Sequence, residues 1–139
     1  MARKKDYLEH LTRVPMFSAC SKKDLDLISR QADEVRLDPG YVLMAEGDVG
    51  QEFFVLLDGK ADITRRGKKL ETIGAGAYVG ELALLDKAPR NATVTAKTPV
   101  TALVLGQREF NGVLAQVPAI SHKIMVGMAR RLHQLDAKA

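Results

Sequence analysis

Glycines interrupt the middle of this chain at short intervals, and this spacing restricts what the chain can fold into. Between residues 35 and 105 they separate short segments of strand-forming residues, at Gly40, Gly47, Gly50, Gly59, Gly67, Gly74 and Gly76. The predicted strands are residues 41–44, 53–57, 61–66, 69–73, 92–96 and 100–105. Strands this short and this evenly spaced predict a mainly β fold, an antiparallel β-barrel or jelly roll.

Helical patterns precede and follow these strands. In residues 1–34, one apolar helix ends at Pro15, and a second begins at Ser21, where Asp24 stands in the capping-box position. Residues 107–116 predict a short helix, and residues 119–135 a longer one with an apolar stripe. We therefore expect a single domain over residues 1–139, with N-terminal helices in 1–34, strands in 35–105 and C-terminal helices in 107–135.

Composition excludes several classes of protein. The 139 residues suit one globular domain, and no apolar run reaches the roughly 18 residues of a membrane span. No signal sequence follows Met1, and Cys20 is the only cysteine, so we expect a cytoplasmic protein. The net charge is +4, but the cations are scattered in pairs, which argues against a nucleic-acid partner. The isolated histidines argue against a metal site.

The segment 80–93 carries the chemistry. It reads Gly-Glu-Leu-Ala-Leu-Leu-Asp-Lys-Ala-Pro-Arg-Asn-Ala-Thr, which predicts a short helix followed by a turn that holds Arg90. The N–H groups at a helix start attract anions, and a guanidinium matches two phosphate oxygens. Glu81 cannot bind the same anion, so a ribose hydroxyl is its expected partner. The segment therefore predicts a phosphorylated sugar that is bound but not transformed.

This segment resembles the phosphate-binding cassette of the cyclic nucleotide-binding domain family. That family includes protein kinase A regulatory subunits, cyclic-nucleotide-regulated channels and the bacterial catabolite activator protein. Leu-Thr-Arg-Val-Pro-Met-Phe at 11–17, Glu-Gly-Asp at 46–48, Phe-Phe-Val-Leu-Leu-Asp-Gly at 53–59 and Met-Ala-Arg-Arg-Leu at 128–132 also resemble family segments, in the same order. The resemblance covers roughly residues 8–135 and implies a stand-alone domain of the bacterial type.

The resemblance implies a role for each cassette residue. Arg90 would bind the exocyclic oxygens of a cyclic phosphate, and Glu81 would accept the ribose 2′-OH with help from the Gly80 amide. The remaining phosphate contacts would come from the backbone amides of Leu82, Ala83 and Ala92.

Two positions depart from the family pattern and leave the base unsettled. Asn91 stands where the family discriminates adenine from guanine, so the sequence favours cAMP and leaves cGMP open. The hydroxyl residue with which the activator reads adenine is replaced here by Leu135 and Asp136. Arg131, with Arg130 as the alternative, is a replacement that could lie over the purine. The expected ligand is thus cAMP, with cGMP as the alternative and no other cofactor.

The absence of a nucleophile, base or metal cluster argues against an enzyme. The leading hypothesis is a ligand-sensing regulatory module in which the C-terminal helix moves as a lid and signals to an effector protein. One alternative is the ligand-binding part of a transcription regulator or channel without its output domain. A second is a structural homologue that has lost the ligand and binds a protein partner. We expect no membrane contact, and a monomer or weak homodimer.

Overall fold

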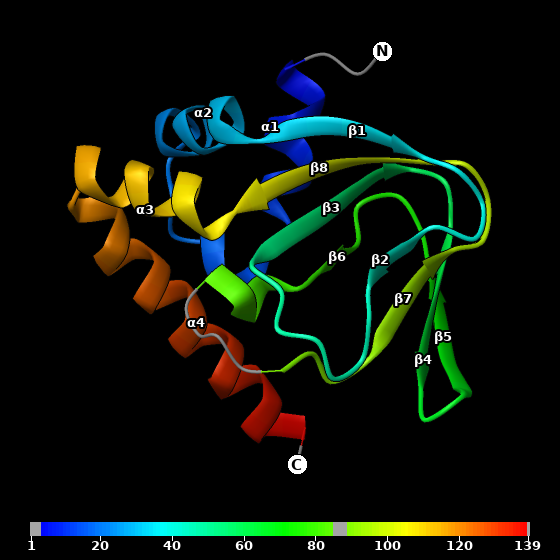
Figure 1. Ribbon diagram of the computed structural model, residues 1–139. Coiled ribbons are helices and arrows are strands. Elements are labelled where there is room, and N and C mark those ends of the chain that lie inside the picture. The colour runs from blue at the N-terminus through cyan, green and yellow to red at the C-terminus, as the bar shows by residue number, and fades with distance from the viewer. Residues whose placement is uncertain (1–3, 85–88, 139) are drawn as a thin grey trace. The chain divides into compact units, whose positions relative to one another are not determined.

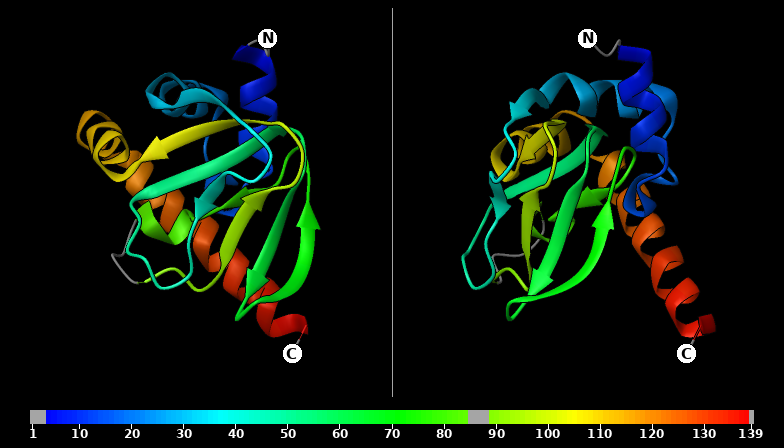
Figure 2. Two further views of the ribbon diagram at one scale, coloured as in Figure 1. Left: turned by 45° about the vertical axis from the view of Figure 1, so that its right-hand side comes forward. Right: turned by 90° about the vertical axis from the view of Figure 1, so that its right-hand side faces the viewer.

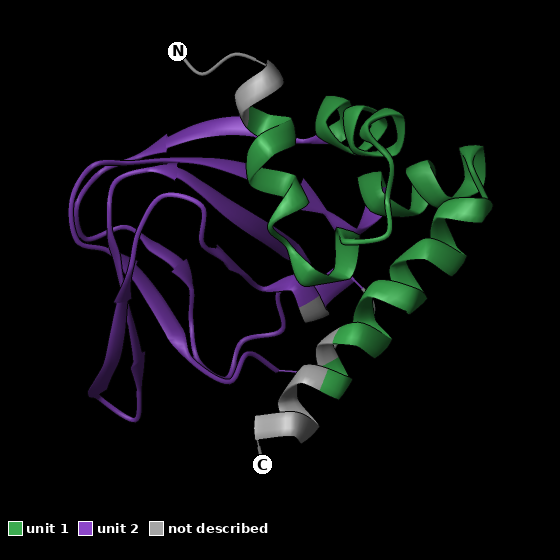
Figure 3. Cartoon of the chain, turned by 180° about the vertical axis from the view of Figure 1, so that it is seen from behind, with its two compact units in different colours: residues 1–31, 109–139 green, residues 32–108 purple. Residues whose placement is uncertain are grey.

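The structure is a computed structural model that describes residues 4–84 and 89–138 (Figure 1). The chain divides into two compact units, residues 1–31 with 109–139 and residues 32–108 (Figure 3). The first unit is helical and the second carries the strands. None of the helices in the described residues has the length and apolar character needed to cross a bilayer.

In the described residues of the β unit, the strands form two four-stranded antiparallel sheets. The first has the order β1-β8-β3-β6, from Asp33–Leu37, Val100–Gly106, Glu52–Asp58 and Tyr78–Val79. The second has the order β2-β7-β4-β5, from Val42–Met44, Thr93–Ala96, Ala61–Arg65 and Lys68–Ile73. Apart from the β4–β5 hairpin, which lies within one sheet, consecutive strands alternate between the two sheets as in a jelly roll. The jelly-roll prediction is confirmed, and the described strands form two separate sheets rather than a closed barrel.

One hydrophobic core joins the two sheets. Strands of both sheets contribute buried side chains to it. The members are Leu43, Phe54, Leu56, Ala61, Val79, Val94, Ala96, Val100 and Ala102. These residues alternate along β3, β7 and β8, as expected when only one face of each strand points at the opposite sheet. Burial of these side chains holds the two sheets against each other, and with them the loops that connect their strands.

Two strands were not among the predicted ones. The strand β1, Asp33–Leu37, contains two acids and an arginine, and β6 is only two residues long. Both segments are strands because they pair with longer ones: β1 pairs with β8, and β6 pairs with β3. Their strand conformation therefore depends on this pairing, and their amino-acid composition does not indicate it.

The helical unit begins with α1, Lys4–Thr12, the short 3-10 helix η1, Pro15–Phe17, and α2, Lys22–Gln31. The predicted capping box is present, because the Ser21 amide donates to the Asp24 carboxylate and the Asp24 amide donates to Ser21 Oγ, each at 3.1 Å. The helices α3, Gln107–Gln116, and α4, Ala119–Lys138, follow the strands.

The helix α4 is fastened to this unit by its first half. Ile120 and Ile124 are buried, and the Lys123 ammonium lies 2.6 Å from the carboxylate of Asp24. A Cβ at Gly127 would lie 2.6 Å from the carbonyl oxygen of Met16, so α4 crosses η1 at backbone contact. Beyond Gly127 the predicted apolar stripe becomes more exposed, since Met128 is half-buried and Leu132 is 63% exposed.

Candidate functional site

The segment after β6 turns sharply at Gly80, whose φ of +81° suits glycine. The turn leads into the 3-10 helix η2, Glu81–Leu84, in place of the first turn of an α-helix. The Ala83 amide donates to the Gly80 carbonyl at 3.0 Å. In this arrangement the Ala83 amide, one of the predicted phosphate contacts, is occupied by the chain itself.

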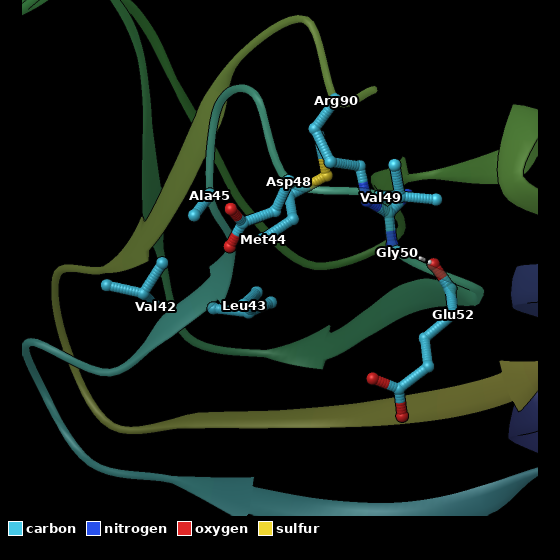
Figure 4. Close-up of a pocket in the computed structure, with 9 residues that line it drawn as sticks. All are labelled: Val42, Leu43, Met44, Ala45, Asp48, Val49, Gly50, Glu52 and Arg90. Atoms are coloured by element: carbon cyan, nitrogen blue, oxygen red, sulfur yellow. Dashed lines mark hydrogen bonds between the residues drawn. The ribbon is translucent and has the colours of Figure 1, made fainter. Parts of the chain in front are cut away.

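Arg90 is anchored through its backbone to the loop that precedes β3. Its amide donates to the Asp48 carbonyl at 2.8 Å, and its carbonyl accepts from the Gly47 amide at 2.9 Å. Its Nη2 donates to the backbone carbonyl of Glu52 at 2.8 Å (Figure 4). The 47–52 segment, which is distant in sequence, therefore holds both the backbone of Arg90 and its guanidinium.

Two glycines give the guanidinium its space. A Cβ at Gly50 would lie 2.3 Å from Arg90 Nη2, and a Cβ at Gly80 would lie 2.7 Å from Arg90 Nη1. No L side chain fits at either position while Arg90 keeps this orientation. The sequence reading took Gly50 only as a turn residue and did not single out Glu52. The signal that could have found them was the second glycine of Gly47-Asp48-Val49-Gly50, two residues before β3 begins at Glu52.

The charge of Arg90 is set by its surroundings. Partial burial lowers the pKa of the guanidinium, and the negative charges of Glu52 and Glu81 oppose this effect. An arginine remains cationic at neutral pH in either case. The site thus holds a half-buried cation whose attraction for an anion is weakly screened by water, with the Glu81 charge close by.

A pocket of about 380 Å³ opens beside Arg90. Its walls come from β2, the loop before β3 and the first residue of β3, and Figure 4 shows all nine lining residues: Val42, Leu43, Met44, Ala45, Asp48, Val49, Gly50, Glu52 and Arg90. The volume falls in the range of about 300–1,000 Å³ typical of small-molecule sites. Among the predicted site residues whose side chains the structure describes, Arg90 is the one that lines this pocket.

The other predicted residues are placed as follows. Asn91 is exposed, and its backbone carbonyl accepts a hydrogen bond from Arg65 Nε at 2.8 Å. Ala92 is buried at 4% exposure, directly before β7. Leu82 lies in η2 and Arg131 in α4, and the side chains of both fall outside the described part of the structure.

The sandwich topology and the arginine beside a pocket place the chain among ligand-binding jelly-roll domains. Residues 34–117 match the family model of the cyclic nucleotide-binding domain. This match covers more than half of the chain, so the chain belongs to the cyclic nucleotide-binding domain family, as the cassette predicted.

Known proteins of two kinds resemble the chain. It is 34% identical over 123 residues to a cAMP-dependent protein kinase regulatory subunit of Aspergillus niger. The aligned region covers 87% of this chain and 30% of that protein. The N-terminal domain of a transcriptional regulator from Streptomyces coelicolor superposes with a TM-score of 0.84 at 32% identity, covering 92% of this chain and 95% of that domain. The Thermus thermophilus catabolite activator protein gives a TM-score of 0.71 at 26% identity, covering 89% and 61%. The chain spans about a third of the length of the regulatory subunits it matches.

Proposed function

We propose that the chain binds a cyclic nucleotide, cAMP in preference to cGMP, and acts as a regulatory module without catalytic activity. The observation that carries the proposal is the Arg90 guanidinium, which is held by the Glu52 carbonyl between two glycines and lies beside a pocket. The Aspergillus niger relative named above is a cAMP-dependent protein kinase regulatory subunit, which favours cAMP as the ligand. Glu81, whose charge acts on Arg90, is the proposed ribose ligand.

Ligand binding requires a local change at the cassette. The Ala83 amide has to leave the Gly80 carbonyl before it can donate to phosphate, so η2 opens or rewinds when the nucleotide binds. This couples occupancy of the site to the conformation of residues 81–84. A ligand that prefers the rearranged cassette shifts the population toward it.

The second half of α4 is the proposed output element. Its first half is fixed by the buried Ile120 and Ile124 and by the backbone contact at Gly127. Leu132, five residues further along, is 63% exposed, so this end can change position without opening the helical core. An effector protein that reads this end is the proposed partner.

The Streptomyces coelicolor domain favours a second candidate within the same class. In this version the chain is the ligand-binding part of a longer transcriptional regulator, and α4 passes the signal to a further domain. Both versions need the same nucleotide site, so one experiment tests their common basis.

Isothermal titration of the chain with cAMP and with cGMP tests the proposal. We expect micromolar or tighter affinity for cAMP, a loss of at least about 100-fold in Arg90→Ala, and weaker binding in Glu81→Ala. The matched control is Arg36→Ala, which removes an exposed arginine from β1 and should bind as the wild type does. No heat with either nucleotide at high protein concentration would overturn the proposal. Asn91→Ala and Asn91→Thr then test base selection, because equal cAMP-to-cGMP ratios in all three proteins exclude a role for that side chain.

A further inference from the structure

The tip of the β4–β5 hairpin concentrates positive charge. Arg65, Arg66, Lys68 and Lys69 surround Gly67, and all of them are exposed. Figures 1 and 2 show this hairpin extending to one end of the β unit, where its tip is uncovered by the other strands of that unit. The tip is therefore accessible to a partner.

The local structure of the tip is unfavourable for these residues. Arg65 lies directly opposite Lys68 in the β4–β5 register, and like charges in that position destabilise a hairpin. Arg66 has a φ of +54° and is the one non-glycine residue with positive φ in the described chain. With Gly67 at +77° it forms a turn in which asparagine, aspartate or glycine is preferred at the first position. Folding alone gives no reason for cations here.

Most of this charge is not neutralised within the chain. Lys69 lies 3.6 Å from the Asp62 carboxylate, whereas residues 4–84 and 89–138 provide no ion pair for Arg65, Arg66 or Lys68. The Glu46 carboxylate accepts from the Arg66 backbone amide, and Arg65 Nε donates to the neutral Asn91 carbonyl. These two bonds fix the orientation of the tip and leave the guanidinium charges available.

Protection of a sheet edge does not explain the cluster. The strand β5 is at the edge of its sheet, where lysines prevent unwanted pairing. Arg65 is at the end of β4, an interior strand of the sheet, where it pairs with Lys68 of β5 just beyond the last residue paired with β7, Thr64, so protection of the β5 edge does not account for a cation there. Next to the cations, Leu70 is unpaired at a bulge in β5 and 50% exposed.

We infer that the Arg65–Lys69 tip, with Leu70 and the free edge of β5, is a docking surface for an extended acidic segment of a partner protein. Carboxylates of that segment would face Arg65, Arg66 and Lys68, and an apolar side chain would cover Leu70. The open backbone groups of β5 would pair with the segment as an added strand. A nucleic acid would use the cations alone, and an anionic membrane would use the cations and Leu70, but neither would pair with the edge of β5, so a protein segment fits more of the observed surface. This inference does not depend on nucleotide binding.

Fluorescence anisotropy with a labelled peptide of alternating glutamate and valine residues tests the inference. The chain contains a second exposed Lys-Lys pair, Lys22 and Lys23, which gives a control with the same change of charge. Relative to the wild type, Lys68→Glu/Lys69→Glu should weaken binding at least about tenfold, and Lys22→Glu/Lys23→Glu by no more than about twofold. Arg65→Glu provides a second disruption on a different strand, and circular dichroism melting checks that each variant folds.

Specificity for a protein segment is tested by competition. Unlabelled acidic peptide should displace the label, while single-stranded DNA and vesicles containing anionic lipid should displace it less at equal charge. Equal losses in the two lysine-pair variants would show that net charge alone attracts the peptide and would overturn the inference. Stronger displacement by DNA or vesicles, or no binding to the wild type, would overturn it as well.

Discussion

Replacing Gly50 with alanine tests whether nucleotide binding depends on the position that the Arg90 guanidinium takes beside Gly50. A Cβ at residue 50 would lie 2.3 Å from Nη2 and 2.4 Å from Nε of Arg90. The backbone of Gly50 does not have a positive φ, so alanine can adopt its conformation, and the methyl group alone is in conflict. The guanidinium has to move by about an ångström or more to restore ordinary contact distances.

The expected loss follows from the bond that this movement breaks. Arg90 donates to the Glu52 carbonyl at 2.8 Å, and hydrogen bonds from charged groups contribute about 1.5–3 kcal/mol net. At about 1.4 kcal/mol per factor of ten, nucleotide affinity should fall about 10- to 150-fold. Stability should change little, because the site is at the surface of the β unit and its core residues are untouched.

Titration calorimetry with cAMP measures the affinity, and thermal unfolding measures the stability. The matched control is Gly112→Ala in α3, where an added Cβ meets nothing within 4 Å. Wild-type affinity in Gly50→Ala would refute the reasoning, since it would mean that ligand binding does not depend on the guanidinium position seen here. A wild-type protein that binds no nucleotide would instead refute the proposed function itself.

Three further predictions concern other parts of the chain. Gly127→Ala should lower the melting temperature even though alanine favours helix by about 1 kcal/mol, because the methyl group meets the backbone of η1; a higher melting temperature would contradict the close crossing. Arg65→Ala should weaken cAMP binding a few-fold in calorimetry by releasing the Asn91 carbonyl beside Arg90, and Arg65→Lys should not restore it, because the Nε donor is absent. Burial raises the pKa of Asp24, but hydrogen bonds from Lys123 and Ser21 outweigh this and hold it below its usual value. The stability it contributes should therefore be complete above about pH 4 and lost as the pH falls through the lowered pKa, and Asp24→Asn should remove this dependence in acid-unfolding curves.

Local structure could be predicted where a few neighbouring residues determine it. The capping box at Ser21 and Asp24, the breaks at Pro15 and Pro118, and the extent of α3 depend on residues within one or two helical turns. Of the eight strands in the part of the chain that the structure describes, six were predicted, because glycines and β-branched residues mark their ends and interiors. The strand predicted over residues 61–66 was one residue too long, because Arg66 belongs to the turn and not to β4.

Features that depend on partners could not be predicted in this way. The strands β1 and β6 exist because β8 and β3 offer them unpaired backbone groups, which their own composition does not reveal. The division into two sheets likewise depends on pairing register across the whole chain. The helix α4 was predicted with one continuous apolar stripe, but the structure buries Ile120 and Ile124 and exposes Leu132.

The sequence by itself determined the family of the chain, because the cassette from Gly80 to Thr93 keeps its acid, arginine and turn residues within one short segment, and it determined local features such as the capping box at Ser21 and Asp24. Only the tertiary structure decided what surrounds Arg90. Its partner carbonyl on Glu52 is 38 residues away, and the arginine that holds the Asn91 carbonyl is 26 residues away. These contacts arise when sheet pairing and core packing bring distant loops together, and the order of residues along the chain does not encode them locally.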